Sequence, residues 1–248
     1  MTLKNFNLRL RLDQTLYLRG FVDTLEESLP LVMSGRVLLP DEKHYPKVGQ
    51  ILSFDANILL LKNKSYVSRG GEKLQYAMNY FGFSVKDFIC LDVGASTGGF
   101  TDYLLKNGAA KIYSVDVGKG QLHNSLIMNK KVISMEKTNA RKSFLLPEKV
   151  DLIVIDVSFI SLKLILLSVI SHLKNNSKIL VLFKPQFELN KNEVPFGGVV
   201  NNNQSISKGV GNFINWCFNN NIKIKGLCYS GIKGRSGNKE IFLLLDNS

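Results

Sequence analysis

Short apolar runs alternate with longer mixed segments over most of the chain beyond residue 87. Seven of these runs are rich in Ile, Val, Leu and Phe and have the length of a buried β-strand. They cover Phe88–Val93, Lys111–Val115, Val132–Met135, Asp151–Ile155, Ile179–Phe183, Ile222–Tyr229 and Ile241–Leu245. Segments long enough for crossover helices separate the first six runs, whereas the last connection, Ser230–Asn238, is short and Gly-rich. The pattern predicts an α/β fold with a doubly wound, mostly parallel seven-stranded sheet whose last strand is antiparallel.

The first 62 residues follow a different pattern of short elements. Helical spacing of apolar residues covers Arg11–Arg19 and Leu25–Met33, and strand-like runs cover Arg36–Leu39 and Ile51–Leu61. Gly35 follows the second helix, where a C-cap favours a residue that tolerates positive φ. We therefore expect a small α+β module at residues 1–62, a linker at 63–70 and the α/β domain at 71–248.

The charge is strongly basic and unevenly divided. The 248 residues contain 32 Lys and Arg against 20 Asp and Glu, a formal net charge of +12. Residues 1–62 carry a net charge of +1, and residues 63–248 carry +11. This balance points to a polyanionic partner for the α/β domain. Because 25 of the cations are Lys and only 7 are Arg, codon bias is an alternative origin of the surplus.

Several classes of protein are disfavoured by what the sequence lacks. Charged residues interrupt both the first 20 residues and the most apolar region, Val150–Leu173, so we expect neither a signal peptide nor stable membrane association. The three cysteines are widely spaced in apolar surroundings, which is typical of reduced, buried thiols. The three histidines show no metal-ligand spacing. The sequence predicts a cytoplasmic protein without a metal.

A glycine-rich turn, Leu91–Asp102, follows the first predicted strand. Asp92 precedes Gly94 at the strand end, and Asp116 ends the second strand about 20 residues later, where an acid pairs with ribose hydroxyls in such sheets. The turn is not the GxGxxG pattern of NAD enzymes. Together these features favour S-adenosylmethionine over NAD. A structural turn with two capping carboxylates remains an alternative.

Four charged residues occupy positions where an unused charge would be costly: Lys73, Asp156, Lys184 and Glu240. Three of them lie at or beside predicted strand termini, the edge where open α/β sheets bind ligands. A lysine among carboxylates and a second lysine suits a general base or a group that polarises a hydroxyl. Each residue alone is more often an ordinary surface charge, but together with the glycine turn they indicate an active site.

These motifs resemble the TlyA family, also called hemolysin A, which joins an S4-type RNA-binding module to an FtsJ-like methyltransferase domain. The resemblance covers nearly the whole chain. It rests on Ser68-Arg69-Gly70-Gly71-Glu72-Lys73-Leu74, the Leu91–Asp102 turn, Asp156-Val157-Ser158-Phe159-Ile160-Ser161, Lys184-Pro185-Gln186-Phe187-Glu188 and Gly197-Gly198-Val199-Val200.

The resemblance implies a Rossmann-like class I enzyme that methylates the ribose 2′-hydroxyl of a cytidine in large-subunit rRNA, and in some members also in small-subunit rRNA. It implies a catalytic tetrad of Lys73, Asp156, Lys184 and Glu240, in which Lys184 orients or deprotonates the hydroxyl. The expected cofactor residues are Asp92, Gly94, Ala95, Ser96, Thr97, Gly98, Gly99, Phe100, Asp116 and Asn139. The expected RNA-binding residues are Arg11, Arg36, Ser68, Arg69 and Phe159.

The N-terminal module departs from the family pattern. Arg11-Leu12-Asp13, Gly20 and Ser34-Gly35-Arg36-Val37 resemble an S4 fold, but the second helix begins Thr24-Leu25-Glu26-Glu27, where such modules usually show Ser-Arg. Pro40-Asp41-Glu42 replaces the usual Asn-Gly hairpin. Acids in place of cations predict a weaker grip on RNA phosphates.

Three other functions are weighed against the rRNA methyltransferase. A secreted membrane-lytic protein, suggested by the family's older name, is disfavoured because the sequence shows neither a signal-peptide pattern nor a basic amphipathic helix. A catalytically inactive RNA-binding protein is disfavoured by the intact tetrad. An NAD oxidoreductase is disfavoured by the glycine turn.

Overall fold

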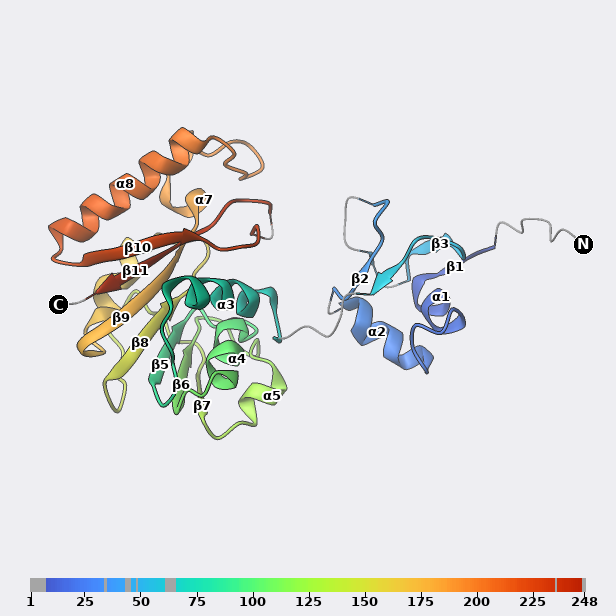
Figure 1. Cartoon of the computed structure of the whole chain (residues 1–248), viewed down its shortest axis with the longest axis horizontal. Coiled ribbons are helices and arrows are strands. Elements are labelled where there is room, and N and C mark those ends of the chain that lie inside the picture. Colours follow the sequence, from blue (N-terminus) through green and yellow to red (C-terminus); the bar gives the residue numbers. More distant parts are fainter. Residues whose placement is uncertain are drawn as a thin grey trace, which may run out of the picture. The chain divides into compact units, whose positions relative to one another are not determined.

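The chain forms two compact units, Met1–Ser65 and Tyr66–Ser248, in a computed structural model (Figure 1). The structure describes residues 8–33, 35–42, 46–47, 49–60, 66–234 and 236–246. Ser34 of the proposed S4-like motif and residues 61–65, which include part of the predicted linker, lie outside these ranges. Within the larger unit the first helix already begins at Arg69, inside the segment we predicted as linker.

The smaller unit contains two helices and two short antiparallel strand pairs. Helices α1 (Leu12–Leu18) and α2 (Leu25–Met33) occupy the two segments with helical periodicity. Strand β1 (Arg9–Arg11) pairs with β3 (Ile51–Ser53), and β2 (Val37–Leu38) pairs with β4 (Leu59–Leu60). The core contains Leu12, Leu16, Leu31, Val32, Val37, Leu39, Leu52 and Ile58.

The sequence missed two features of this unit. The three residues of β1 are too few to show an alternating pattern. The run Ile51–Leu61 is two strands of different sheets, because a turn in which the Ala56 amide donates to the Ser53 carbonyl ends β3.

The larger unit is built on a seven-stranded sheet, as predicted. Its strands are β5 (Ile89–Val93), β6 (Lys111–Val115), β7 (Val132–Met135), β8 (Val150–Ile155), β9 (Leu173–Phe183), β10 (Lys223–Tyr229) and β11 (Ile241–Asp246). Their order is β10-β11-β9-β8-β5-β6-β7. The pairs among β5, β6, β7, β8 and β9 are parallel, and β11 is antiparallel to both of its neighbours, β9 and β10. The prediction of a mostly parallel sheet with an antiparallel last strand is confirmed.

Helices cover both faces of this sheet (Figure 1). They are α3 (Arg69–Phe81), α4 (Gly99–Lys106), α5 (Asn124–Ile127), α6 (Lys163–Ile170), α7 (Pro185–Glu188) and α8 (Asn203–Asn219), with a short 3₁₀ turn at Lys191–Glu193. Residues of α3 and α4 belong to one core cluster, and residues of α6 and α8 belong to the other. Between β7 and β8, residues 136–149 contain no helix although that segment is long enough for one. It carries Asn139 and Pro147, and both residues disfavour a helix interior.

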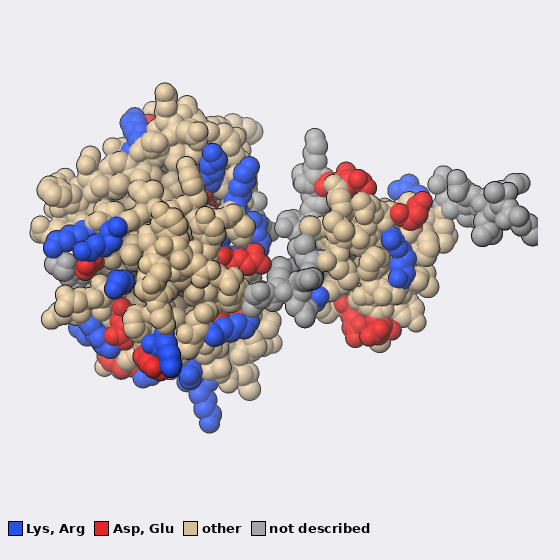
Figure 2. All heavy atoms as spheres, viewed as in Figure 1, with Lys and Arg blue, Asp and Glu red and all other residues tan. Residues whose placement is uncertain are grey.

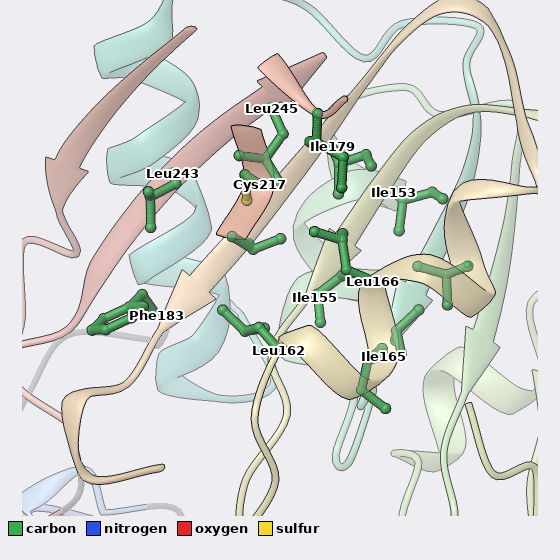
Figure 3. Packing of buried hydrophobic residues seen from close by; sticks show 14 of the residues in the cluster. Ile153, Ile155, Leu162, Ile165, Leu166, Ile179, Phe183, Cys217, Leu243 and Leu245 are labelled. Carbon is green, nitrogen blue, oxygen red and sulfur yellow. The ribbon is translucent and has the colours of Figure 1, made fainter. Parts of the chain in front are cut away.

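The face under α6 and α8 shows why the strands are continuously apolar. Leu162, Ile165 and Leu166 at α6 pack against Ile153 and Ile155 of β8 (Figure 3). Phe183 ends β9 in the same cluster, and its ring lies 5.9 Å from that of Phe213 on α8. Strands buried on both faces have no solvent side, so they carry no polar alternation.

Candidate active site

The four predicted catalytic residues come together at one edge of the sheet. Asp156 directly follows β8 and Lys184 directly follows β9, which run parallel. Glu240 precedes β11, whose Ile241 pairs with Phe183, so the antiparallel direction of β11 brings its first residues to the same edge. Lys73 reaches the edge from the beginning of α3. The topology assembles four charges from three strands and one helix.

Two lysine–carboxylate pairs result. Lys73 Nζ lies 2.6 Å from Glu240 Oε2, with only 10% and 4% of the two side chains exposed. Lys184 Nζ lies 2.5 Å from Asp156 Oδ1 and donates a hydrogen bond to Ser158 Oγ over 3.0 Å. Removing such charges from water costs more than a stabilising role usually returns. Buried charge pairs of this kind are therefore typical of functional sites.

A cavity of about 180 Å³ separates these pairs from the glycine-rich turn. Lys73, Lys184, Asp156 and Ser158 line one side of it. The other lining residues are Ser68, Gly70, Asp92, Gly94, Ala95, Ser96, Thr97, Gly99 and Phe100. The cavity therefore joins three of the four catalytic candidates to the first strand of the sheet.

Asp92 is the fully buried acid of this cavity. Its Oδ2 accepts a hydrogen bond from Thr101 Oγ1 at 2.7 Å, and its Oδ1 has no hydrogen-bond partner among the described residues. Burial, with smaller contributions from the neighbouring carboxylates Asp156 and Asp116, raises the pKa of Asp92 to about 7, against the lowering effect of the Thr101 bond. A buried acid with an unused oxygen is suited to a cationic ligand group.

A second, larger cavity of about 590 Å³ continues from the first, and both are lined by Gly94, Ser96, Asp156 and Ser158. It extends past Asp116 at the end of β6 and past Asn139 in the β7–β8 connection. The carboxylate of Asp116 is held by the backbone, because Oδ2 accepts from the Ser96 amide at 2.8 Å and Oδ1 from the Gly118 amide at 2.7 Å. The two cavities together have the size and mixed lining of a small-molecule site.

The glycines of the turn serve packing as well as ligand access. Gly94 has φ of +84°, and a Cβ there would lie 2.5 Å from the carbonyl oxygen of Asp156. A Cβ at Gly98 would approach the side chain of Leu126 to 2.3 Å, and one at Gly99 would lie 3.0 Å from the Gly71 amide. Gly94 thus lets β5 and β8 approach each other at the site, whereas Gly98 and Gly99 let helices pack closely.

The other predicted site residues of the larger unit have different positions relative to the two cavities. Gly98 lines neither cavity and begins α4 with φ of +94°. Ser68 caps α3 by accepting from the Gly70 amide, and Arg69 Nη2 donates to the Lys233 carbonyl at 2.6 Å. Phe159 is almost fully exposed on the larger cavity, with its ring 5.0 Å from that of Phe187.

Arg11 and Arg36 belong to the smaller unit. Arg11 pairs with Asp13 at 2.9 Å, and Arg36 Nε is buried without a hydrogen-bond partner among the described residues. These two predicted RNA contacts are therefore on a separate unit from the tetrad.

Three residues with a role at this edge were not singled out from the sequence. Ser158 accepts from Lys184. Glu188 accepts from Ser161 Oγ and the Leu162 amide at 2.7 and 2.6 Å, so it ties the loop after β8 to α7, and burial raises its pKa. Asn238 is buried and bonds both the Val200 amide and the Gly198 carbonyl, which fixes the Gly-Gly-Val-Val loop beside Glu240. Ser158 and Glu188 lie inside quoted motifs, but Asn238 gave no signal because its partners are about 40 residues away.

Candidate metal sites and membrane-spanning helices are both absent from the part of the chain that the structure describes. Over the described ranges, no group of three His, Cys, Asp or Glu is arranged to hold a metal ion. Over the same residues, no helix has both the length and the apolar character needed to span a bilayer. The three cysteines are free, buried thiols.

The fold and the two joined cavities define a Rossmann-like methyltransferase. Residues 66–247 match the FtsJ-like methyltransferase family. The chain is 38% identical over 234 residues to hemolysin A of Brachyspira hyodysenteriae, covering 93% of this chain and 97% of the relative. It is 37% identical over 250 residues to the 16S/23S rRNA (cytidine-2′-O)-methyltransferase TlyA of Mycobacterium tuberculosis, covering 96% and 90%.

Among solved structures, a protein of Streptococcus thermophilus described as a candidate hemolysin superposes with a TM-score of 0.75 at 35% identity, covering 97% of this chain and 89% of that one. The chain belongs to the TlyA (hemolysin A) family of FtsJ-like methyltransferases. The resemblance found in the motifs is confirmed.

Proposed function

We propose that the protein transfers the methyl group of S-adenosylmethionine to the 2′-hydroxyl of a cytidine ribose in ribosomal RNA. The observation that carries this proposal is the pairing of Lys184 with Asp156 and of Lys73 with Glu240 beside the cavity that begins at Asp92. The relative from M. tuberculosis is named for this reaction on 16S and 23S rRNA. We infer a large-subunit target here, and the small subunit is to be tested as a second substrate.

The residues of the two cavities fit S-adenosylmethionine. The unpartnered Oδ1 of Asp92 suits the ammonium group of the methionine portion, because a cation would compensate the cost of that buried carboxylate. The backbone-held carboxylate of Asp116 suits the ribose hydroxyls. Asn139, in the larger cavity, suits the adenine side. When bound, the cofactor supplies an electrophilic methyl group.

The chemistry of the chain's own residues concerns the proton of the 2′-hydroxyl. Lys184 orients the 2′-hydroxyl or accepts its proton as the hydroxyl oxygen becomes a nucleophile. Asp156 and Ser158 fix the Nζ of Lys184 before and after the transfer, because each contacts it directly. Lys73 donates to the substrate oxygen or its neighbours from a position that Glu240 holds at 2.6 Å. The tetrad positions the hydroxyl and balances the charge that it develops.

The charge distribution supports an RNA substrate for the larger unit. Residues 63–248 carry a net charge of +11. The smaller unit, which we propose as a divergent S4-like module, shows acidic as well as basic side chains on its surface (Figure 2). Residues 1–62 carry a net charge of only +1. Phosphate contacts dominate affinity for nucleic acids. We infer that the larger unit supplies most of the RNA affinity and that the protein works in the cytoplasm, where ribosomal RNA is located.

The test is methyl transfer to isolated ribosomal subunits with radiolabelled S-adenosylmethionine, followed by mapping of the 2′-O-methylated nucleotide. Wild-type protein should label one cytidine ribose, and Lys184→Ala should abolish the label. Lys174→Ala is the matched control, because Lys174 pairs with Asp151 at 2.8 Å away from both cavities. Label on a base or on protein, or no label at all, would overturn the proposal. Leakage of liposomes in a parallel assay would favour the lytic alternative.

A further inference from the structure

A third cavity, of about 350 Å³, lies beside the tetrad but shares no lining residue with the two cofactor cavities. Glu240 lines it, and the partner of Glu240, Lys73, lines the first cofactor cavity. The Lys73–Glu240 pair therefore stands between the two spaces. The other lining residues are Tyr76, Tyr229, Ser230, Gly231, Ile232, Lys233 and Lys239. We call this space the tyrosine cleft.

The tyrosine cleft is preformed by contacts between α3 and the β10–β11 hairpin. Tyr76 lies one turn after Lys73 on α3, and the backbone of Gly231 packs so closely on it that a Cβ would lie 2.7 Å from the ring. Gly231 also has φ of +74°, so both space and backbone conformation require glycine. Arg69 Nη2 bonds the Lys233 carbonyl, and the Ser230 amide bonds the Glu240 carbonyl at 3.0 Å. Tyr76 and Arg69 therefore anchor the hairpin to α3, and the Ser230–Glu240 bond closes the hairpin itself.

The chemistry of the cleft matches a nucleotide. Tyr76 and Tyr229 are 48% and 57% exposed, which is unusual for two large aromatic residues of one cavity. Lys233 and Lys239, both exposed, add positive charge at the same lining. Aromatic side chains that stack on bases, beside cations that meet phosphates, are the recurrent arrangement of single-stranded nucleic-acid sites. A purely apolar partner would not use the two lysines.

We propose that the tyrosine cleft binds the base of the nucleotide next to the methylated one, with Tyr76 and Tyr229 stacking on the base and Lys233 and Lys239 near its phosphate. This inference rests on the proposed function, because the tetrad defines where the reacting ribose lies. The neighbouring nucleotide then holds the RNA strand in the cleft. Glu240 lies between this nucleotide and the cofactor. The cleft makes the enzyme sensitive to the residue beside the target cytidine.

The experiment compares Tyr229→Leu and Tyr76→Leu with Tyr229→Phe and Tyr76→Phe. Leucine keeps apolar bulk but removes the aromatic face, whereas phenylalanine keeps the face. We expect the leucine variants to raise KM for ribosomal subunits about tenfold, the range of one lost base stack, and the phenylalanine variants to remain near wild type. Affinity for S-adenosylmethionine, measured by calorimetry, should stay unchanged in all four. Tyr80→Leu is the control, because Tyr80 is 62% exposed on the same helix but outside the cleft.

A binding assay separates the failure of this inference from the failure of the proposed function. Affinity for a fluorescent single-stranded RNA that carries the target sequence is measured for the same variants by anisotropy. The proposed role of the cleft would be refuted by an equal loss of affinity in Tyr76→Leu, Tyr229→Leu and the control Tyr80→Leu. It would also be refuted if none of the three variants lost affinity. Wild-type protein that binds this RNA through both tyrosines but transfers no methyl group would leave the cleft supported and refute the proposed function.

Discussion

Lys73 and Glu240 are 167 residues apart in the sequence, yet Lys73 Nζ lies 2.6 Å from Glu240 Oε2 and both side chains are almost fully buried. The pair joins the first helix of the larger unit to its last strand. It also separates the cofactor cavity from the tyrosine cleft. This one contact therefore connects two distant elements of the fold and also forms part of the proposed active site.

This pair predicts a non-additive effect on stability. Lys73→Met and Glu240→Leu should each lower the free energy of unfolding, by roughly 3–5 kcal/mol where the remaining group stays charged, because its partner is lost from a buried position. Lys73→Met combined with Glu240→Leu should recover most of that loss, since no charge remains buried. Urea unfolding measures all four proteins. Additive losses in the double variant would contradict the buried pair, and no variant is expected to retain methyl transfer.

Asp92 predicts a pH-dependent cost to stability. Its pKa is raised from 3.8 to about 7, so the folded state favours the protonated acid, and stability is lost as pH rises from about 4 through 7. In the absence of cofactor, Asp92→Asn should therefore be more stable than wild type at pH 8, by up to about 4 kcal/mol, and no more stable at pH 4. Thermal unfolding across this pH range provides the measurement.

The same Asp92→Asn substitution should weaken S-adenosylmethionine binding at pH 8, because the carboxylate that compensates the ligand cation is gone. Asp151→Asn is the control, since Asp151 accepts from the Ile89 amide and pairs with Lys174 away from the cavities. That variant should lose stability and keep cofactor affinity. If Asp92→Asn bound the cofactor as well as wild type, Asp92 would not face its ammonium group.

Gly94 predicts a loss of function through the backbone. Gly94→Ala would place a Cβ 2.5 Å from the carbonyl oxygen of Asp156 and force a positive φ on alanine. We expect this variant to lose cofactor binding and methyl transfer, because the strand end that carries Asp156 must move. Gly211→Ala on α8 is the matched control, since nothing lies within 4 Å of its Cβ and its φ is not positive. This control should gain up to about 1 kcal/mol of stability and keep full activity.

The acidic start of α2 predicts a gain of RNA affinity on charge reversal. Glu26 and Glu27 are exposed in the first turn of this helix. Glu26→Arg with Glu27→Arg in the full chain should tighten RNA binding and steepen its salt dependence, because two cations replace two anions at a surface proposed to face phosphates. Anisotropy titrations at 50 and 300 mM salt, about sixfold apart, test this. Unchanged affinity at low salt would argue that the smaller unit does not approach RNA.

Periodicity in the sequence was sufficient to predict the sheet of the larger unit because buried parallel strands are continuous apolar runs. It also predicted the antiparallel last strand, since Ser230–Asn238 leaves no room for a crossover. It could not predict the beginning of β9 at Leu173, because Lys174, Asn175 and Asn176 carry no strand pattern. The register between β8 and β9 shifts at this point, from Val150–Leu173 to Leu152–Lys178. Strand β1 was missed for another reason: its three residues are too few to show an alternating pattern.

The meeting of the four proposed tetrad residues at one edge could be predicted, because each lies beside a strand end or in a motif. Their partners were harder to predict. Asn238 and Ser158 act through hydrogen bonds to groups that only the fold brings near. The tyrosine cleft was not predicted, because Tyr76 on a helix and Tyr229 on a strand share no sequence pattern. Distances between elements are set by packing, which a linear pattern does not encode.

Strand β11 lies between β9 and β10, so a single hairpin carries both the last member of the tetrad and one wall of the tyrosine cleft. The residues proposed to bind the cofactor lie on the other side, at the ends of β5, β6 and β8. If both proposals hold, the sheet has one half that holds the methyl donor and another half that meets the acceptor. On this proposal, substitutions at the cleft wall of the hairpin would change which RNA sequence is accepted while the donor half stays intact, so target choice could evolve independently of the chemistry.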